Sequence, residues 1–250
     1  MTLSKKARSI SALEIGLPIF AGKRFLDKDL NRCFGDLEAS GTLIEEIRAQ
    51  ELAPLLKGTD ILIDLHSTIK PSVPFVCVPK FDHPAAEIIP FFNTQHIITG
   101  DGLLTQDGKP IYADTFVNAH GGFGITVESG YENNSMLVEL IRDSVISALK
   151  HLGVLQGKLE CGLSRAVIEK TPYPLEECTI WDAYWNVIAG ENFSWTKPWG
   201  NFDSMPAGTH FATSDSTKLV AEENSIILFP KDGANIIPGS EVCIIAKKQE

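Results

Sequence analysis

The sequence contains no apolar run of about 18 residues, which is the length that a membrane-spanning helix requires. It is also poor in basic residues: 22 lysines and arginines are outnumbered by 32 aspartates and glutamates, which gives a formal net charge of −10. Nucleic acids and anionic membranes bind basic surfaces, so neither is expected as a main partner. An anionic small molecule is compatible with this charge if a local group of arginines attracts it.

Cysteines are few, and they lack the spacing of a structural site. Five of them are scattered along the chain without a C-x-x-C pair (Cys33, Cys77, Cys161, Cys178, Cys243). This pattern is typical of buried thiols in a reducing cytoplasm rather than of a disulfide framework or a thiolate zinc site. A mildly apolar run follows the basic residues at the N-terminus, but Glu14 interrupts it and no clear cleavage site follows. We therefore expect a cytoplasmic protein without a targeting signal.

Common nucleotide-binding and nucleophile motifs are also missing. Neither the Rossmann nor the P-loop fingerprint occurs. The stretch "HGGFG" at residues 120–124 has the glycines of an oxyanion loop, but no G-x-S-x-G elbow supplies a serine nucleophile. Candidate catalytic or binding residues must therefore be sought outside these motifs.

The hydrophobic pattern predicts alternating helices and strands in the first part of the chain. Helices are predicted over residues 41–58 and 134–153, and strands over residues 60–66, 74–79, 96–100 and 121–130. Thr42 and Glu45 have the spacing of a capping box for the first helix, and Ser135 is placed to cap the second. The alternation predicts an α/β domain with a mixed, mostly parallel sheet flanked by helices.

The pattern changes after residue 157, where short β-like runs are separated by proline, glycine, aspartate and asparagine. All four tryptophans fall within residues 181–199 of this part. We expect an α/β domain over residues 1–156 and a smaller, β-rich domain over residues 157–250.

Two predicted strands end in residues that could carry chemistry. In open α/β sheets, functional residues gather at the carboxyl ends of the strands. His66 ends "DILIDLH" and could be a metal ligand, a general base or a core histidine. Glu128 lies in "GITVESG" and could be a general base, a helix cap or a solvated carboxylate. The residues alone leave these alternatives open.

The stretch "RFLDKDLNRCFG" at residues 24–35 is unusually polar for its length. A solvated turn with interleaved charges explains its lysines, but it explains Asn31 poorly, because asparagine is a weak helix former. Arg24 and Arg32 could each bind a carboxylate or an oxyanion with the planar guanidinium, while Asp29 holds one of them in position.

Several motifs together resemble the succinylglutamate desuccinylase/aspartoacylase family of zinc carboxypeptidase-like hydrolases. An arginine followed by "DLNR", the strand "DILIDLHST" and the strand "GITVESG" occur in the order of that family. The stretches "VIEKTPYP" and "ILFPKDGANIIPGSEVCIIA" are similar to its β domain. The resemblance covers nearly the whole chain and implies a zinc carboxypeptidase-like fold.

The resemblance also implies roles for individual residues. His66 would bind zinc, Glu128 would activate the zinc-bound water, and Arg24 would stabilise the tetrahedral oxyanion. Asn31 and Arg32 would hold the α-carboxylate of the substrate, with Asp29 supporting the arginines. The implied activity is zinc-dependent hydrolysis of the amide bond of an N-acyl amino acid or a similar small carboxylate.

The sequence departs from the family pattern at two places. The family's first two zinc ligands belong to an H-G-x-E type motif before the arginine, but no histidine precedes Arg24 here, and the pair His83 and Glu87 has a different spacing and place. The family's substrate-binding tyrosine and arginine, shortly before the glutamate, are not evident; Asp114 and Asn118 lie in that region. The acyl group is therefore left open.

Two hypotheses from different classes follow. The first is a zinc amidohydrolase whose N-terminal metal-binding segment is absent from the sequence as given. The second is a metal-free, non-catalytic relative that binds a small carboxylate or a protein partner. The missing H-x-x-E motif favours the second hypothesis. The first is favoured by the presence of the five residues Arg24, Asn31, Arg32, His66 and Glu128. Whether the chain forms a homo-oligomer is left open.

Overall fold

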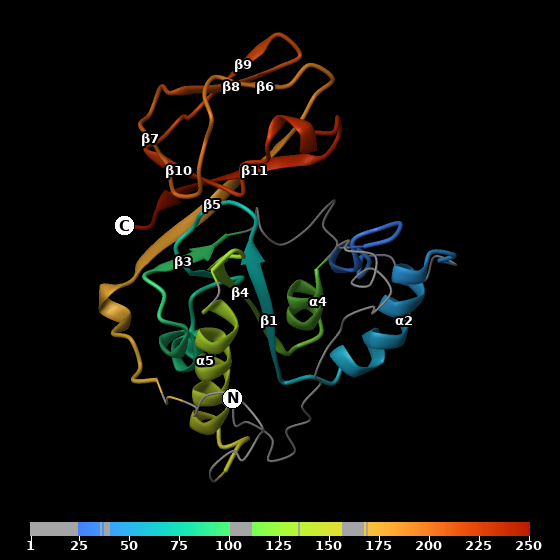
Figure 1. Ribbon diagram of the computed structural model, residues 1–250, viewed down its shortest axis with the longest axis vertical. Helices are drawn as coiled ribbons and strands as arrows, with labels where there is room; N and C mark the ends of the chain where they lie inside the picture. The colour runs from blue at the N-terminus through green and yellow to red at the C-terminus, as the bar shows by residue number, and fades with distance from the viewer. Residues whose placement is uncertain are drawn as a thin grey trace. The chain divides into compact units, whose positions relative to one another are not determined.

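The structure is a computed structural model (Figure 1), and it describes residues 25–35, 37, 41–100, 112–134, 136–156, 168 and 170–250. Arg24, Ser135 and Cys161 lie outside the described residues. The chain forms two compact units, the first from Met1–Asp64 and Leu104–Thr126, the second from Leu65–Leu103 and Val127–Glu250. The predicted domain boundary at residues 156 and 157 meets a stretch outside the described residues, so it stays a prediction.

In the part of the chain that the structure describes, the central sheet has eight strands, and its parallel and antiparallel pairs confirm the predicted mixed α/β fold. In spatial order they are β1 (Ile61–Thr68), β4 (Phe123–Tyr131), β2 (Phe75–Cys77), β3 (His96–Thr99), β5 (Thr179–Ile188), β11 (Glu241–Lys248), β10 (Ser225–Leu228) and β7 (Ser204–Met205). The pairs β2–β3 and β3–β5 are parallel. The pairs β5–β11, β11–β10 and β10–β7 are antiparallel. The four strands predicted in the first part of the chain are thereby confirmed to within a few residues.

The first unit has an apolar core built by short helices. They are η1 (Leu30–Arg32), α2 (Ile44–Leu56) and α4 (Ala113–Ala119). The core residues are Cys33, Phe34, Ala49, Leu52, Ala53, Leu56, Ala113, Phe116 and Val117. The predicted capping box of α2 is wrong, because Leu43 is the N-cap and no side chain caps the helix. Glu45 makes contacts with a different segment, described below.

The second unit contains α5 (Leu137–His151), the longest helix among the described residues, at the place predicted from the sequence. The other helical segments of this unit are α3 (His83–Ile88), η2 (Ile89–Phe92), η4 (Leu175–Glu177) and η5 (Gly233–Asn235). No helix in the described part of the chain is both long and apolar enough to cross a membrane.

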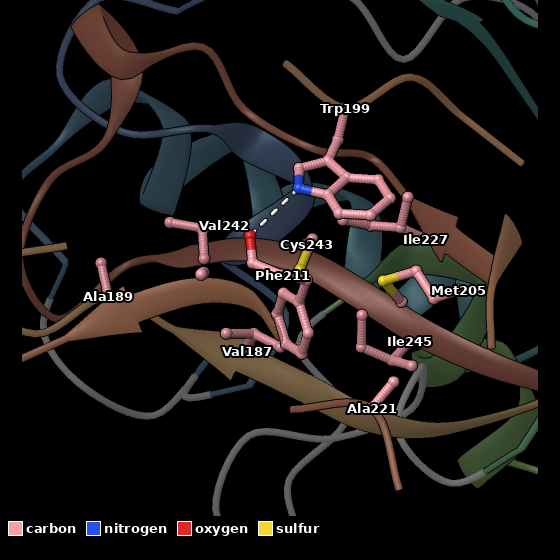
Figure 2. Close-up of a cluster of buried hydrophobic side chains, with 11 residues drawn as sticks. Val187, Ala189, Trp199, Met205, Phe211, Ala221, Ile227, Val242, Cys243 and Ile245 are labelled. Carbon is pink, nitrogen blue, oxygen red and sulfur yellow. Dashed lines mark hydrogen bonds between the residues drawn. The ribbon is translucent and has the colours of Figure 1, made fainter. Parts of the chain in front are cut away.

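The last part of the chain is rich in strands, as predicted. β5 and β11 run side by side (Figure 1). They pair antiparallel at seven positions, with two register shifts along the ladder. A separate three-stranded sheet is formed by β6 (Ser194–Trp195), β8 (His210–Ser214) and β9 (Thr217–Val220). Figure 2 shows the buried apolar cluster of this region, in which the indole N–H of Trp199 donates to the backbone oxygen of Phe211 at 3.1 Å. The buried tryptophan is therefore both packed and hydrogen-bonded.

Candidate active site

The polar segment that the sequence analysis singled out forms a short 3-10 turn in the first unit. Asp29 caps this turn, since its Oδ1 accepts a hydrogen bond from the backbone N–H of Asn31 at 3.0 Å. The carbonyl oxygen of Asp29 accepts from the backbone N–H of Arg32 at 2.9 Å and from the Cys33 thiol at 3.3 Å. Asp29 therefore fixes the backbone conformation at Asn31 and Arg32.

Asn31 links η1 to two other elements of the first unit. Its Nδ2 donates to Asp64 Oδ2, on β1, at 3.2 Å, and its Oδ1 accepts from the backbone N–H of Ala113, the first residue of α4, at 2.8 Å. The first N–H groups of a helix have no partner within the helix, so Asn31 satisfies one of them. The amide of Asn31 thus orders the segment around it, in addition to the substrate contact that the family resemblance implies.

Arg32 has an exposed side chain with a fixed position. Its guanidinium carbon lies 4.3 Å from the centre of the Tyr112 ring, and its Nη1 donates to the carbonyl oxygen of Asn31 at 2.9 Å. Stacking on an aromatic ring and one backbone hydrogen bond restrict the rotamers of the long side chain. A guanidinium held this way still has further N–H groups for a carboxylate.

α4 is held against β4 by two polar side chains, those of Asp114 and Asn118. The carboxylate of Asp114, which is 7% exposed, accepts from the Thr115 backbone N–H at 2.7 Å and from the Thr126 hydroxyl at 2.9 Å. The Asn118 amide bonds both backbone groups of Gly124, accepting from its N–H at 2.8 Å and donating to its oxygen at 3.3 Å. Both side chains are therefore used to hold the helix against the strand.

Gly124 is the reason that α4 can approach so closely. A Cβ at this position would lie 2.4 Å from the backbone oxygen of Asp114, which is closer than real Cβ atoms come to a backbone oxygen. The glycine-rich entry "GGFG" contained the signal for this contact, because glycine in a strand often marks a close backbone approach. The partner of this close approach, the backbone of Asp114, could not be identified from the glycines alone.

His66 and Glu128 lie on neighbouring strands of the second unit. His66 is half-buried on β1, and Glu128 is 6% exposed on β4. The two strand ends are joined by a hydrogen bond from the Glu132 backbone N–H to the Thr68 oxygen at 3.0 Å. The structure therefore brings the ends of these two strands together, while the functional roles of His66 and Glu128 stay predictions.

The described residues do not supply a zinc site with three protein ligands, which is the usual number for a catalytic zinc. Among them, no group of three or more histidine, cysteine, aspartate or glutamate side chains could hold a metal ion. Three other histidines have partners elsewhere: His96 Nδ1 and Trp181 Nε1 at 3.2 Å, His120 Nδ1 and the Phe116 oxygen at 2.8 Å, and His210 Nε2 and the Thr213 hydroxyl at 3.1 Å. His66 would have to be joined by ligands from outside the described residues.

The catalytic-domain model of the succinylglutamate desuccinylase/aspartoacylase family matches residues 17–137. A probable aspartoacylase of Nostoc sp. is 45% identical over 56 residues, which is 19% of this chain and 19% of that protein. The aligned part thus spans about a fifth of the length of this curated relative.

Solved structures with a similar fold cover most of the chain. The succinylglutamate desuccinylase of Vibrio parahaemolyticus has a TM-score of 0.68 and 19% identity, over 93% of this chain and 68% of that one. Murine aminoacylase 3 has a TM-score of 0.65 and 16% identity, over 93% of this chain and 81% of that one. The ectoine utilization protein EutE of Ruegeria pomeroyi has a TM-score of 0.56 and 18% identity, over 91% of this chain and 71% of that one. The predicted resemblance is confirmed: residues 17–137 match the catalytic-domain model of the succinylglutamate desuccinylase/aspartoacylase family, and the fold is similar to those of solved succinylglutamate desuccinylases.

Proposed function

We propose that this chain carries the active site of a hydrolase that cleaves the amide bond of an N-acyl amino acid or a similar small carboxylate. The observation that carries the proposal is the family match over residues 17–137, since this range includes all six residues singled out from the sequence. The exposed, ordered guanidinium of Arg32 and the buried carboxylate of Glu128 support it.

Each of the predicted site residues is assigned a role that fits the chemistry of its side chain. Arg32 binds the α-carboxylate of the substrate with its planar fork, and Asn31 and Asp29 hold the turn that presents it. Glu128 is the general base that takes a proton from the water attacking the amide carbonyl. Arg24 provides the positive charge that stabilises the oxyanion formed by this attack.

Zinc dependence belongs to this proposal, with His66 as one ligand. The described residues contain no complete ligand set, so we derive no step of the reaction through the metal. The count of bound zinc, by native mass spectrometry, tests the ligand role directly. His66→Ala should lose the zinc, while His210→Ala, which changes a histidine that pairs with Thr213 on β8, should retain it. Equal zinc content in both variants would remove His66 from the proposal.

Release of the free amino acid tests the activity. N-acetylaspartate and N-succinylglutamate are suitable substrates, because the relatives are an aspartoacylase and a succinylglutamate desuccinylase by name. Glu128→Gln should lower kcat about 100-fold or more. Glu132→Gln is a matched control, since this glutamate is exposed just after β4. Wild-type turnover in Glu128→Gln would exclude the general-base role.

The binding role of Arg32 is tested with the same substrates. Arg32→Ala should weaken binding by at least about 2 kcal/mol, as is typical when a charge-paired partner is lost. Arg48→Ala removes an arginine that pairs with Glu51 on the surface of α2, so it should leave binding unchanged. Wild-type affinity in Arg32→Ala would reject the carboxylate-binding role.

The second candidate is a metal-free, non-catalytic relative that binds a small carboxylate or a protein partner. The observation that favours it is that no group of three or more metal-ligating side chains was found in the part of the chain that the structure describes. Calorimetric binding of an N-acyl amino acid without release of product, in a preparation that stays free of zinc after incubation with it, would select this candidate over the hydrolase.

A further inference from the structure

Glu45 is a buried carboxylate that the proposed reaction does not use. It stands in the first turn of α2, where the sequence placed it in a capping box, but it is 1% exposed and its contacts are made with another segment. Its Oε1 accepts hydrogen bonds from the backbone N–H groups of Leu26 at 2.7 Å and Asp27 at 3.3 Å. α2 thereby holds the chain just before it enters η1.

The carboxylate of Glu45 is held in its charged form. Burial alone would raise its pKa, but the backbone hydrogen bonds around it, including those from Leu26 and Asp27, outweigh burial and lower the pKa below its usual value. Its Oε2 is buried and has no hydrogen-bond partner within the described residues. A buried charge that keeps one oxygen without a partner costs free energy, so the two bonds of Oε1 must offset that cost.

The neighbouring residue Glu46 provides the contrast within the same helical turn. Its Oε1 pairs with the Lys28 ammonium at 3.1 Å, and both side chains are partly exposed to water (27% and 41%). Two exposed ends of long side chains restrain a backbone weakly, because both can move together. Glu45 binds the backbone itself, so its contact determines the path of residues 26 and 27.

We propose that Glu45 is a positioning residue for the substrate-binding segment: it fixes the backbone at Leu26 and Asp27, and thereby the place from which η1 presents Arg32. This inference rests on the proposed function, since it assigns Glu45 to the binding of the same substrate. Arg32 is five residues from Asp27, and Asp29 and Asn31 pass the constraint along the turn through their own hydrogen bonds.

Hydrogen exchange of the amides at residues 25–32 tests the contact without any substrate. In Glu45→Ala, exchange at Leu26 and Asp27 should become about tenfold faster or more, the change expected for losing a hydrogen bond to a charged group. Glu45→Gln keeps an acceptor oxygen and should fall between wild type and Glu45→Ala. Glu46→Ala, the matched control, should change exchange less than about twofold. Unchanged exchange in both Glu45 variants would overturn the contact.

Kinetics with N-acetylaspartate or N-succinylglutamate tests the role in binding. Glu45→Ala should raise KM about tenfold while kcat stays within about threefold, and Glu45→Gln should recover part of the loss. A fall in kcat at constant KM, or no kinetic change despite faster exchange, would overturn the positioning role. If wild type cleaves neither substrate while exchange responds as expected, the proposed function fails and the binding role of Glu45 fails with it, although the contact itself is confirmed. Should Glu45→Ala not fold, Glu45→Gln gives both readouts.

Discussion

The two units of the molecule are stabilised in different ways. In the first unit, segments that bear predicted site residues are held by single polar side chains: η1 has no buried residue, and Asn31 and Glu45 supply contacts that fix it. In the second unit, the region of β5, β11 and β10 is held by continuous backbone pairing over an apolar core. Substitutions should therefore disturb the site segment locally, and the strand-rich region globally.

This difference has a consequence for function. A backbone ladder distributes its free energy over many bonds, whereas a bridging side chain such as Asn31 concentrates it in a few, among them those to Asp64 and Ala113. One substitution in the first unit can shift a binding residue and leave the rest folded. The same chemical change in the strand-rich core would lower the free energy of unfolding instead.

The largest expected effect is in the core shown in Figure 2. Phe211 is fully buried, and its ring packs edge-on against Trp185 with ring centroids 5.5 Å apart. Phe211→Ala should lower the free energy of unfolding by about 3–5 kcal/mol, measured by urea titration. Ile237→Ala, at a residue that is 65% exposed, should change it by less than about 0.5 kcal/mol. If Phe211→Ala lowered the free energy of unfolding by less than about 1 kcal/mol, the apolar core would not be what stabilises the strand-rich region, and the contrast between the two units would be contradicted.

A smaller effect is expected at the contact between α4 and β4. Gly124→Ala would place a Cβ 2.4 Å from the Asp114 oxygen, so the helix must move away from the strand. The expected loss is about 1–3 kcal/mol in the free energy of unfolding, as for other overpacked sites. Gly58→Ala is the control, since the nearest atom to its added Cβ, the Leu55 oxygen, is 3.9 Å away. Equal stability of the two variants would show that α4 is not held as closely as the structure shows.

The helices and strands could largely be predicted from the sequence, because hydrophobic periodicity is local. The long amphipathic helix and the strands of His66 and Glu128 were found in this way. The contacts of Glu45 and Asn31 could not be predicted, since their partners lie 19 and 82 residues away in sequence. Glu45 shows the limit: its spacing from Thr42 predicted a local cap, but the backbone of Leu26 and Asp27 competes for the same carboxylate.

Acid should weaken the two units in a defined order. Burial lowers the pKa of His96 below its ordinary value of 6.5, and its neutral Nδ1 accepts from the Trp181 indole. Its contribution is therefore complete above pH 6.5 and is lost as the pH falls from there toward the lower folded-state pKa. Glu45 has a pKa below its usual 4.5, so its contribution is lost only as the pH falls below 4.5 and through the folded-state pKa.

Hydrogen exchange as a function of pH measures this order. Segments around His96 should lose protection first, and residues 26 and 27 only in stronger acid. His96→Phe removes the titrating group and should flatten the response of β3 as the pH falls below 6.5. A simultaneous loss in both segments would mean that the two units unfold together in acid.

The smallest expected effect separates buried from exposed polar contacts within one segment. Lys28 pairs with Glu46 at 3.1 Å, but the lysine side chain is 41% exposed, so water and salt screen the pair. Lys28→Met should lower the free energy of unfolding by less than about 1 kcal/mol and leave exchange at Leu26 unchanged. Adding salt should reduce even this difference. If Lys28→Met disturbed the segment as much as Glu45→Ala, the exposed ion pair rather than the buried carboxylate would hold the segment. Burial would then not be the feature that distinguishes Glu45 from Glu46.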